Sequence, residues 1–366
     1  MADMTRRDVI QGTLAGLSAV GAGVGGALPA LAVPAKPESA GYKLCELWGN
    51  PQASEITIAK QIGVTHVIAG GGLRGRKEDY VAAAQKMKDS WAAVGMTVVG
   101  VEGHPTPFEG LKAGTATADD EIEMAKWGIE ALSKAGINMI CYNFMAGLGW
   151  TRTNTRLPER GGALTSEFDA SAPAMQQPMP RYGEISEEKM WANITKYLKA
   201  VIPVADKFKV KMALHPDDPP MSPLRGIARI CTSAKNYRRI MDIVPSPMNG
   251  VTFCQGNFVL MGEDVYSLAA DWCRKKKIFF IHFRDVEGNK QKFHETFHDN
   301  GPTDMARMLQ IYSKNGFDGP IRPDHAPALA SDNVGAGGSS GYTMGAKVLA
   351  FGYMRGIMEG MKLPFA

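Results

Sequence analysis

Residues 211–215 read Lys-Met-Ala-Leu-His, a short apolar run that ends in a histidine. A run of this length is typical of a buried strand in a parallel sheet, because such strands are covered on both faces. A stretch with helical periodicity, Glu187 to Phe208, comes directly before it. Short apolar runs and helical stretches alternate in both directions along the chain, which is typical of repeated βα units.

Eight such units can be counted from Tyr42 onward. Eight repeats favour a closed (β/α)8 TIM barrel, a single α/β domain, over an open doubly wound sheet. No GxGxxG or GxxxxGK[ST] motif follows a strand, which argues against nucleotide binding. The predicted strands are Lys43–Leu47, Thr65–Ala69, Thr97–Val101, Asn138–Tyr142, Lys211–Leu214, Val251–Phe253, Phe279–His282 and Pro320–Arg322. The longer predicted helices are Glu78–Ala93, Asp119–Ala135, Glu187–Phe208, Val265–Arg274, Thr303–Asn315 and Met344–Met361.

The first residues predict an export signal. Arg6 and Arg7 precede an apolar stretch rich in Gly and Ala, and the small-residue pattern Ala30-Leu31-Ala32 follows. This layout is typical of a twin-arginine signal peptide, with a membrane-anchored or disordered tail as the alternative. We therefore expect a signal at 1–32, a linker at 33–41 and a barrel at 42–366. The protein would be periplasmic or otherwise exported, and the Tat export machinery would be a partner.

Residues 151–183 interrupt the repeat after the fourth predicted strand and are rich in Gly, Pro, Ser and Arg. Long connections in compact barrels are usually functional, and barrel active sites form at the carboxyl ends of the strands. We predict that this insert is a lid over the site. A structureless decoration is the alternative.

The charge balance does not indicate a nucleic-acid partner. The chain has 41 basic and 37 acidic residues, a formal net charge of +4, and the two signs are mixed along its length. The densest basic run, Arg274 to Lys277, is better explained as the end of a helix, where cations oppose the helix dipole. Five scattered cysteines are not typical of a disulfide scaffold. A homo-oligomer is expected only from its general frequency among such proteins.

Four side chains that can ligate a metal stand at the ends of four successive predicted strands. They are His215, Cys254, His282 and Asp324. Consecutive barrel strands bring their last residues side by side around one rim, so these four can converge on one ion. Each alone is explained by ordinary structure, but together they predict a site for a divalent transition metal. The thiolate favours zinc or ferrous iron, and oxygen ligands from a substrate would also suit manganese.

Two specific motifs stand at the ends of predicted strands, residues 215–220 (HPDDPP) and 322–325 (RPDH), in this order. With these motifs the chain resembles the mannonate dehydratase family from about residue 95 onward. Similar segments also occur at residues 141–145, 150–153 and 293–296 and at the helix that begins with Gly341 and Tyr342. The resemblance implies a xylose-isomerase-like TIM barrel, metal ligation by the four residues above, and Mn²⁺ or Fe²⁺ as the usual metal.

The resemblance also implies a reaction. The family removes water from D-mannonate to give 2-keto-3-deoxy-D-gluconate, so the chain is expected to be a carbon–oxygen lyase. Loss of the C2 proton builds negative charge on the substrate carboxylate, which a bound cation stabilises. The resemblance implies that His325 and Tyr342 transfer protons. We assign the base to His325 and the acid to Tyr342, although the two roles could be exchanged.

Substrate contacts are predicted from residue chemistry. Arg152 and Arg322 are candidates for the substrate carboxylate, because a guanidinium can bind a carboxylate with two parallel hydrogen bonds. Asn143 and His298 are candidates for contacts with hydroxyl groups.

Two other functions stay open. Residues 326–340 lack the arginine-containing loop expected before the family's tyrosine, and loops at the barrel mouth decide the substrate. The first alternative is therefore a related barrel isomerase, epimerase or lyase that acts on another sugar acid or an oxidised glycoside. The second is a non-catalytic sugar-acid binding protein, which the presence of both His325 and Tyr342 disfavours.

Overall fold

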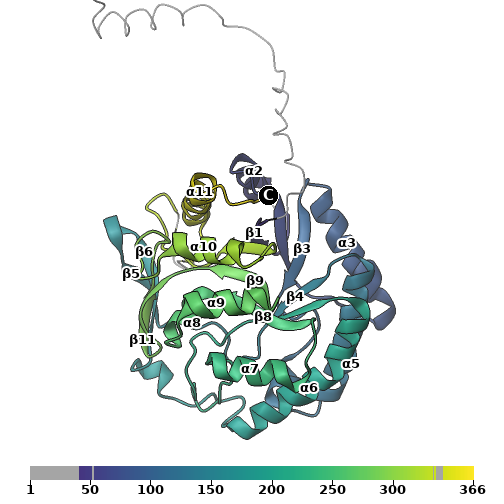
Figure 1. The fold of residues 1–366 in the computed structure, drawn as a ribbon. Coiled ribbons are helices and arrows are strands. Elements are labelled where there is room, and N and C mark those ends of the chain that lie inside the picture. The colour runs from purple at the N-terminus through teal and green to yellow at the C-terminus, as the bar shows by residue number, and fades with distance from the viewer. Residues whose placement is uncertain (1–40, 52, 333, 335–340) are drawn as a thin grey trace, which may run out of the picture. The chain divides into compact units, whose positions relative to one another are not determined.

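The protein is described by a computed structural model over residues 41–51, 53–332, 334 and 341–366. The predicted signal at 1–32, and the linker up to residue 40, lie outside the described residues. Eight parallel strands close into a barrel, in the order β1-β12-β9-β8-β7-β4-β3-β2, and this confirms the predicted fold class (Figure 1). They are β1 (Lys43–Trp48), β2 (His66–Gly70), β3 (Thr97–Glu102), β4 (Met139–Tyr142), β7 (Lys211–Leu214), β8 (Asn249–Cys254), β9 (Ile278–Phe283) and β12 (Pro320–Pro323).

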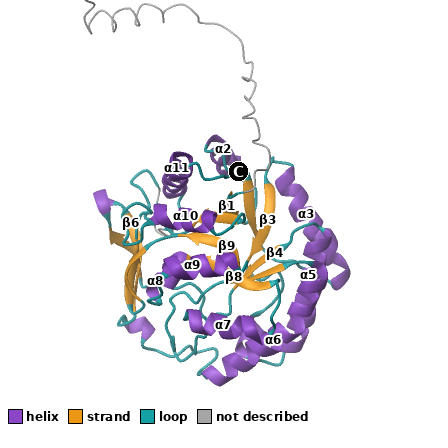
Figure 2. Ribbon diagram, viewed as in Figure 1, coloured by secondary structure: helices purple, strands orange, loops and turns teal. Residues whose placement is uncertain are grey.

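Helices surround the barrel strands (Figure 2). They are α2 (Ala53–Gln61), α3 (Tyr80–Ala92), α4 (Glu109–Ala113), α5 (Ala118–Lys134), α6 (Glu187–Phe208), α7 (Ala234–Ile243), α8 (Gln255–Leu260), α9 (Val265–Arg274), α10 (Met305–Lys314) and α11 (Met344–Gly360). Over the described residues, none of the helices has both the length and the apolar character that crossing a membrane requires.

The barrel has an inner and an outer apolar layer, which explains why its strands are apolar on both faces. Side chains such as Cys45, Ile68 and Phe280 fill the interior. The opposite faces of the strands pack against the helices in a larger core that includes Trp91 and Trp272.

The predicted element boundaries agree with the structure to within about two residues, and the differences have local causes. Helix α10 begins at Met305 because the carboxylate of Asp304 accepts the Arg307 N–H as an N-cap. Helix α3 begins at Tyr80 because a 3₁₀ turn, Lys77–Asp79, precedes it. The basic run after Arg274 does follow the end of a helix, α9.

The insert after β4 contains regular structure, so the structureless alternative is wrong. Strands β5 (Asn154–Pro158) and β6 (Leu164–Asp169) form a hairpin. It joins a second hairpin after β9, formed by β10 (Val286–Asn289) and β11 (Lys292–Glu295), in an antiparallel sheet of order β10-β11-β6-β5. Phe168 on β6 and Phe293 on β11 are register partners in this sheet, and their buried rings pack against each other. The sheet lies beside the barrel (Figure 1), and its role as a lid stays a prediction.

Candidate active site

The four predicted ligands lie on four neighbouring barrel strands. His215 directly follows β7, Cys254 ends β8, His282 is the penultimate residue of β9 and Asp324 directly follows β12. Cys254 and His282 are register partners in the sheet. The barrel therefore brings together four residues that are distant in sequence, as expected from the strand count.

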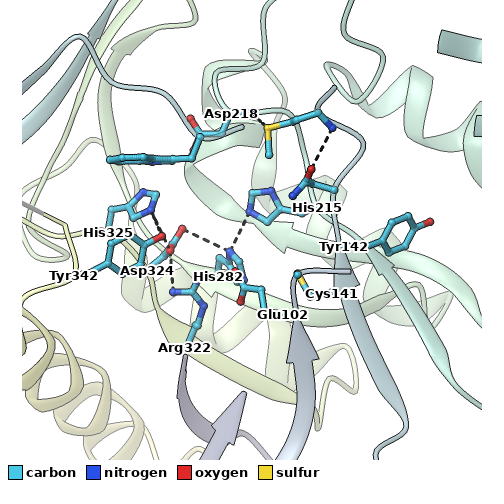
Figure 3. A pocket seen from close by; sticks show the side chains of 14 residues that line it. Glu102, Cys141, Tyr142, His215, Asp218, His282, Arg322, Asp324, His325 and Tyr342 are labelled. Carbon is cyan, nitrogen blue, oxygen red and sulfur yellow. Dashed lines mark hydrogen bonds and ion pairs between the residues drawn. The ribbon is translucent and has the colours of Figure 1, made fainter. Parts of the chain in front are cut away.

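The ligand atoms of His215, Cys254 and His282 lie within 4.8 Å of one another, and Figure 3 shows Asp324 beside His282 in the same pocket. His215 Nε2 lies 3.1 Å from His282 Nδ1, and Asp324 Oδ2 lies 3.6 Å from the same His282 nitrogen. Cys254 Sγ lies 3.7 Å from Asp324 Oδ2. Two imidazole nitrogens, a sulfur and a carboxylate oxygen at these distances form a donor set suited to a divalent transition metal.

The charges around His282 also fit a cation. Burial and the charge of Arg322 both oppose protonation of this imidazole, yet Glu102 and Asp324 outweigh them and raise the His282 pKa well above its usual range. The neighbouring His215 has its pKa lowered to about 4 by burial and by the charge of His282. This pocket of the protein favours one positive charge between the two rings, which a metal ion can supply in place of a proton.

Glu102, at the end of β3, belongs to the site although the sequence analysis did not name it. Its Oε2 lies 3.3 Å from His282 Nε2, and its Oε1 accepts a hydrogen bond from Arg322 Nη2 at 3.0 Å. Burial would raise its pKa, but the charges of Arg322 and His282 lower the pKa to about 2. Its position at the end of a strand could have identified it, but it lies in none of the motifs that the sequence shows.

His325 and Tyr342 form a hydrogen-bonded pair. Tyr342 Oη lies 2.5 Å from His325 Nε2, and the other ring nitrogen, Nδ1, lies 3.3 Å from Glu295 Oε1. Loss of solvation raises the pKa of Tyr342, and the charge of Asp324 raises it further, so the phenol stays protonated. The tyrosine therefore donates and the imidazole accepts.

A buried ion-pair network lies behind this pair. Arg152 bonds to Asp218 Oδ1 at 2.7 Å and to Glu295, while Arg284 bonds to Asp218 Oδ2 and to Glu295 Oε2, both at 2.8 Å. Arg284 Nη1 also lies 3.3 Å from Cys254 Sγ. All these side chains are nearly inaccessible to solvent. Arg284 could not be predicted from the sequence, because an arginine after a strand has no distinctive spacing.

One cavity of about 140 Å³ is lined by most of the site residues. Its volume suits a small molecule. The residues that line it are Glu102, Gly103, Cys141, Tyr142, Asn143, Met145, Trp150, His215, Asp218, His282, Arg322, Asp324, His325 and Tyr342. Cys254 is fully buried and is not among the residues that line this cavity.

The predicted substrate residues divide into two groups. Arg322 and Asn143 line the cavity. Arg152 does not, because both ends of its guanidinium bond to carboxylates of the ion-pair network. His298 does not either, since its Nε2 lies 2.7 Å from the Phe283 carbonyl oxygen and its ring lies against a separate small pocket beside α11. The placement of Arg152 and His298 therefore argues against their predicted contacts with substrate.

Solved structures with the same barrel define the class of protein first. A xylose isomerase domain protein from Alicyclobacillus acidocaldarius subsp. acidocaldarius matches with a TM-score of 0.57 and 11% identity, over 88% of this chain and 99% of that chain. At this identity the likeness shows the fold alone. The fold and the site thus define the chain as a TIM barrel with a cluster of potential metal ligands at the carboxyl ends of its strands.

Sequence comparison narrows the class to one family. The sequence model of D-mannonate dehydratase (UxuA) matches residues 47–179 and 172–364. A mannonate dehydratase of Streptococcus agalactiae serotype Ia is 31% identical over 303 residues, which cover 76% of this chain and 85% of that relative. The crystal structure of mannonate dehydratase from Streptococcus suis serotype 2 matches with a TM-score of 0.78 and 27% identity, over 89% of this chain and 96% of that one. The chain belongs to the D-mannonate dehydratase family.

Proposed function

We propose that this chain is a metal-dependent hydro-lyase that removes water from D-mannonate to give 2-keto-3-deoxy-D-gluconate. One observation supports this proposal most directly. In this chain, which belongs to the family, three of the candidate metal ligands line the same cavity as the His325–Tyr342 pair; they are His215, His282 and Asp324. A site for a cation and a site for proton transfer therefore share one small space, as dehydration next to a carboxylate requires.

The proposed metal is Mn²⁺ or Fe²⁺, with Zn²⁺ as the alternative. His215, Cys254, His282 and Asp324 would hold it. When bound, the cation supplies Lewis acidity toward the substrate's oxygen atoms. The donor set does not select among these ions, because the thiolate suits iron and zinc while the carboxylate suits manganese.

We assign His325 as the general base and Tyr342 as the general acid. Glu295 lies beside His325 Nδ1 and favours a proton there, which leaves Nε2 as the basic nitrogen. Tyr342, whose pKa is raised, carries the proton that would be delivered to the departing C3 hydroxyl. In this assignment His325 accepts the proton from C2 and Tyr342 protonates the departing C3 hydroxyl. The base and the acid are the two groups that the hydrogen bond already joins.

Arg322 is the better candidate for the substrate carboxylate. Unlike Arg152, it lines the cavity. Its Nη1 pairs with Asp324 Oδ1 at 2.9 Å and its Nη2 donates to Glu102 Oε1 at 3.0 Å, so Nε is the donor without a hydrogen-bond partner among the described residues. Asn143, which also lines the cavity, is the candidate for a hydroxyl contact. We do not assign a substrate contact to Arg152, because its guanidinium serves the buried network.

The proposal is tested on the full chain loaded with Mn²⁺ or Fe²⁺ under reducing conditions. Conversion of D-mannonate is followed by NMR in heavy water, and bound metal is measured by elemental analysis. We expect the 2-keto-3-deoxy product, with loss of metal in Cys254→Ala and loss of turnover but not of metal in His325→Ala. Cys273→Ala, a buried cysteine outside the site, is the matched control. Metal binding without conversion of mannonate would contradict the proposed substrate and would favour another sugar acid.

We also propose export through a twin-arginine signal at residues 1–32, which rests on the sequence pattern alone. We expect cell fractionation to find the full chain outside the cytoplasm and a variant with Arg6→Lys and Arg7→Lys inside it. Equal distribution of the two proteins would contradict export by this route.

A further inference from the structure

We infer that Asp332 is a positioning residue for Tyr342: its carboxylate caps helix α11 and so holds the tyrosine against His325. The inference rests on the dehydration proposed above and deepens it. Asp332 lies in the loop that follows β12, the same loop that begins with Asp324 and His325. Helix α11 begins at Met344, two residues after Tyr342.

The amino end of α11 is capped from outside its own sequence. Thr343 occupies the N-cap position, but its side chain accepts no hydrogen bond from the helix. Instead Asp332 Oδ1 accepts the Gly345 N–H at 2.8 Å, and Asp332 Oδ2 accepts the Thr343 hydroxyl at 2.7 Å. A carboxylate oxygen thus satisfies a free N–H of the first turn, and its charge stands at the positive end of the helix dipole.

Gly345 leaves room for this contact. A Cβ atom at residue 345 would lie 2.6 Å from Asp332 Oδ1 and 2.8 Å from Oδ2, closer than such atoms approach. The Leu329 N–H also donates to Asp332 Oδ2 at 2.8 Å, so the carboxylate holds its own loop in a turn while it binds the helix. Asp332 therefore joins the two segments that carry His325 and Tyr342.

Tyr342 is held by contacts of its ring and by the backbone on either side of it. Its ring lies beside the rings of His325 and Trp150, while about 40% of its surface is exposed. The neighbouring backbone is tied by one bridge, in which the Ala326 N–H donates to the Gly341 carbonyl at 3.3 Å. On the far side of the first turn, Lys347 Nζ lies 3.2 Å from Glu46 Oε1 and anchors α11 to β1. Asp332 is the contact that fixes the turn nearest to Tyr342.

The test compares Asp332→Ala and Asp332→Asn with the wild-type enzyme. We expect Asp332→Ala to lower kcat by roughly 10- to 100-fold, because a displaced general acid loses its catalytic contribution. KM and the affinity for Mn²⁺ should change by no more than about twofold, because the ligands and Arg322 are untouched. Asp332→Asn keeps one oxygen acceptor and should recover part of the activity. Exchange of the C2 proton in heavy water, which needs the base, should fall less than dehydration.

Asp264→Ala is the matched control. Asp264 caps α9 by accepting two backbone N–H groups and one hydroxyl, from Tyr266, Ser267 and the Ser267 side chain. This number of bonds equals that of Asp332. We expect a similar loss of thermal stability with kcat unchanged. An equal fall of kcat in both variants would overturn the inference, because it would show that Asp332 acts only through stability.

A second measurement needs no substrate. 3-Fluorotyrosine placed at position 342 reports the surroundings of that ring by ¹⁹F NMR. We expect a shifted or narrowed signal in Asp332→Ala and the wild-type signal in Asp264→Ala; an unchanged signal in Asp332→Ala would overturn the inference. If the wild-type enzyme fails to dehydrate mannonate, the proposed function fails, and the ¹⁹F signal still decides whether Asp332 positions Tyr342.

Discussion

Glu102 contacts His282 and Arg322, which both line the cavity. Its contact with His282 decides which nitrogen of that imidazole is available to a ligand. Its carboxylate lies 3.3 Å from His282 Nε2, so this nitrogen carries the proton and Nδ1 points toward His215 and Asp324. Carboxylates that bind the outer nitrogen of a ligating imidazole commonly orient it and raise its basicity. Glu102 is in the position to do this here.

Loss of the Glu102 carboxylate should weaken metal binding. We expect Glu102→Ala to lower the affinity for Mn²⁺ by about 10- to 100-fold, as for other residues that orient a ligating histidine. Glu102→Gln keeps an oxygen acceptor for His282 and should lose less. Titration calorimetry on the metal-free protein measures both, with Glu123→Ala, an exposed carboxylate on α5, as the control. Equal affinities for all variants would show that Glu102 does not orient His282.

His104 should make stability depend on pH in the acid range. Burial lowers its pKa to about 4, from 6.5 for an ordinary histidine. Its ring nitrogens lie 2.9 Å from Tyr197 Oη and 3.0 Å from the Thr106 carbonyl oxygen, and its ring stacks on Phe108. Between these pKa values the unfolded chain binds a proton that the folded chain does not.

The stability that depends on neutral His104 is therefore complete above pH 6.5 and is lost as the pH falls toward 4. We expect a loss of at most about 3 kcal/mol over this range from this residue. Denaturant unfolding at several pH values measures it, and His104→Gln should show a smaller loss than the wild type. A parallel pH dependence in the two proteins would contradict the assignment.

At the scale of elements, the antiparallel sheet of the insert is connected to the site by Arg152. This arginine lies two residues before β5 and reaches Asp218 after β7 and Glu295 on β11. Burial would raise the pKa values of both carboxyl groups, but the charges of Arg152 and Arg284 lower them well below the usual range. Glu295 in turn lies beside His325. The insert is thereby linked through one buried charge to the proposed base.

Removal of Arg152 should be costly because it leaves two buried carboxylates with a single arginine. We expect Arg152→Met to lower the free energy of unfolding by about 3–5 kcal/mol. The double variant Arg152→Met, Glu295→Gln should recover part of this loss. Denaturant unfolding measures both. A loss below about 1 kcal/mol would show that Arg284 alone compensates the two carboxylates, contrary to this interpretation.

At the scale of the whole molecule, metal bound at four different barrel strands should stabilise the closed barrel. A ligand that binds only the folded state at 100 times its Kd adds about 2.7 kcal/mol to stability. We expect removal of the metal by a chelator to lower Tm by several degrees in the wild type, and Cys254→Ala to respond much less. Calorimetry measures the shift. Equal responses in the two proteins would argue against a metal at this site.

Much of this architecture could be predicted from local patterns. The eight strands and the larger helices follow from hydrophobic periodicity, which depends on near neighbours in the chain. The strand ends then indicated His215, Cys254, His282 and Asp324, and the barrel brings them together. Arg152 shows the limit of this reasoning, because its chemistry suits a substrate carboxylate as well as it suits the two buried carboxylates that it contacts.

The sequence by itself determined the barrel, the order of its strands and the residues at their carboxyl ends. Hydrophobic periodicity, and the strand count that follows from it, depend only on short segments of the chain. Only the tertiary structure decided that Glu102 faces His282, that Arg284 lies behind Cys254, and that Asp332 caps the helix after Tyr342. It also decided that the insert pairs with a strand more than 100 residues away, β11. These contacts join residues of separate elements, and such partners are set by packing in three dimensions rather than by any spacing along the chain.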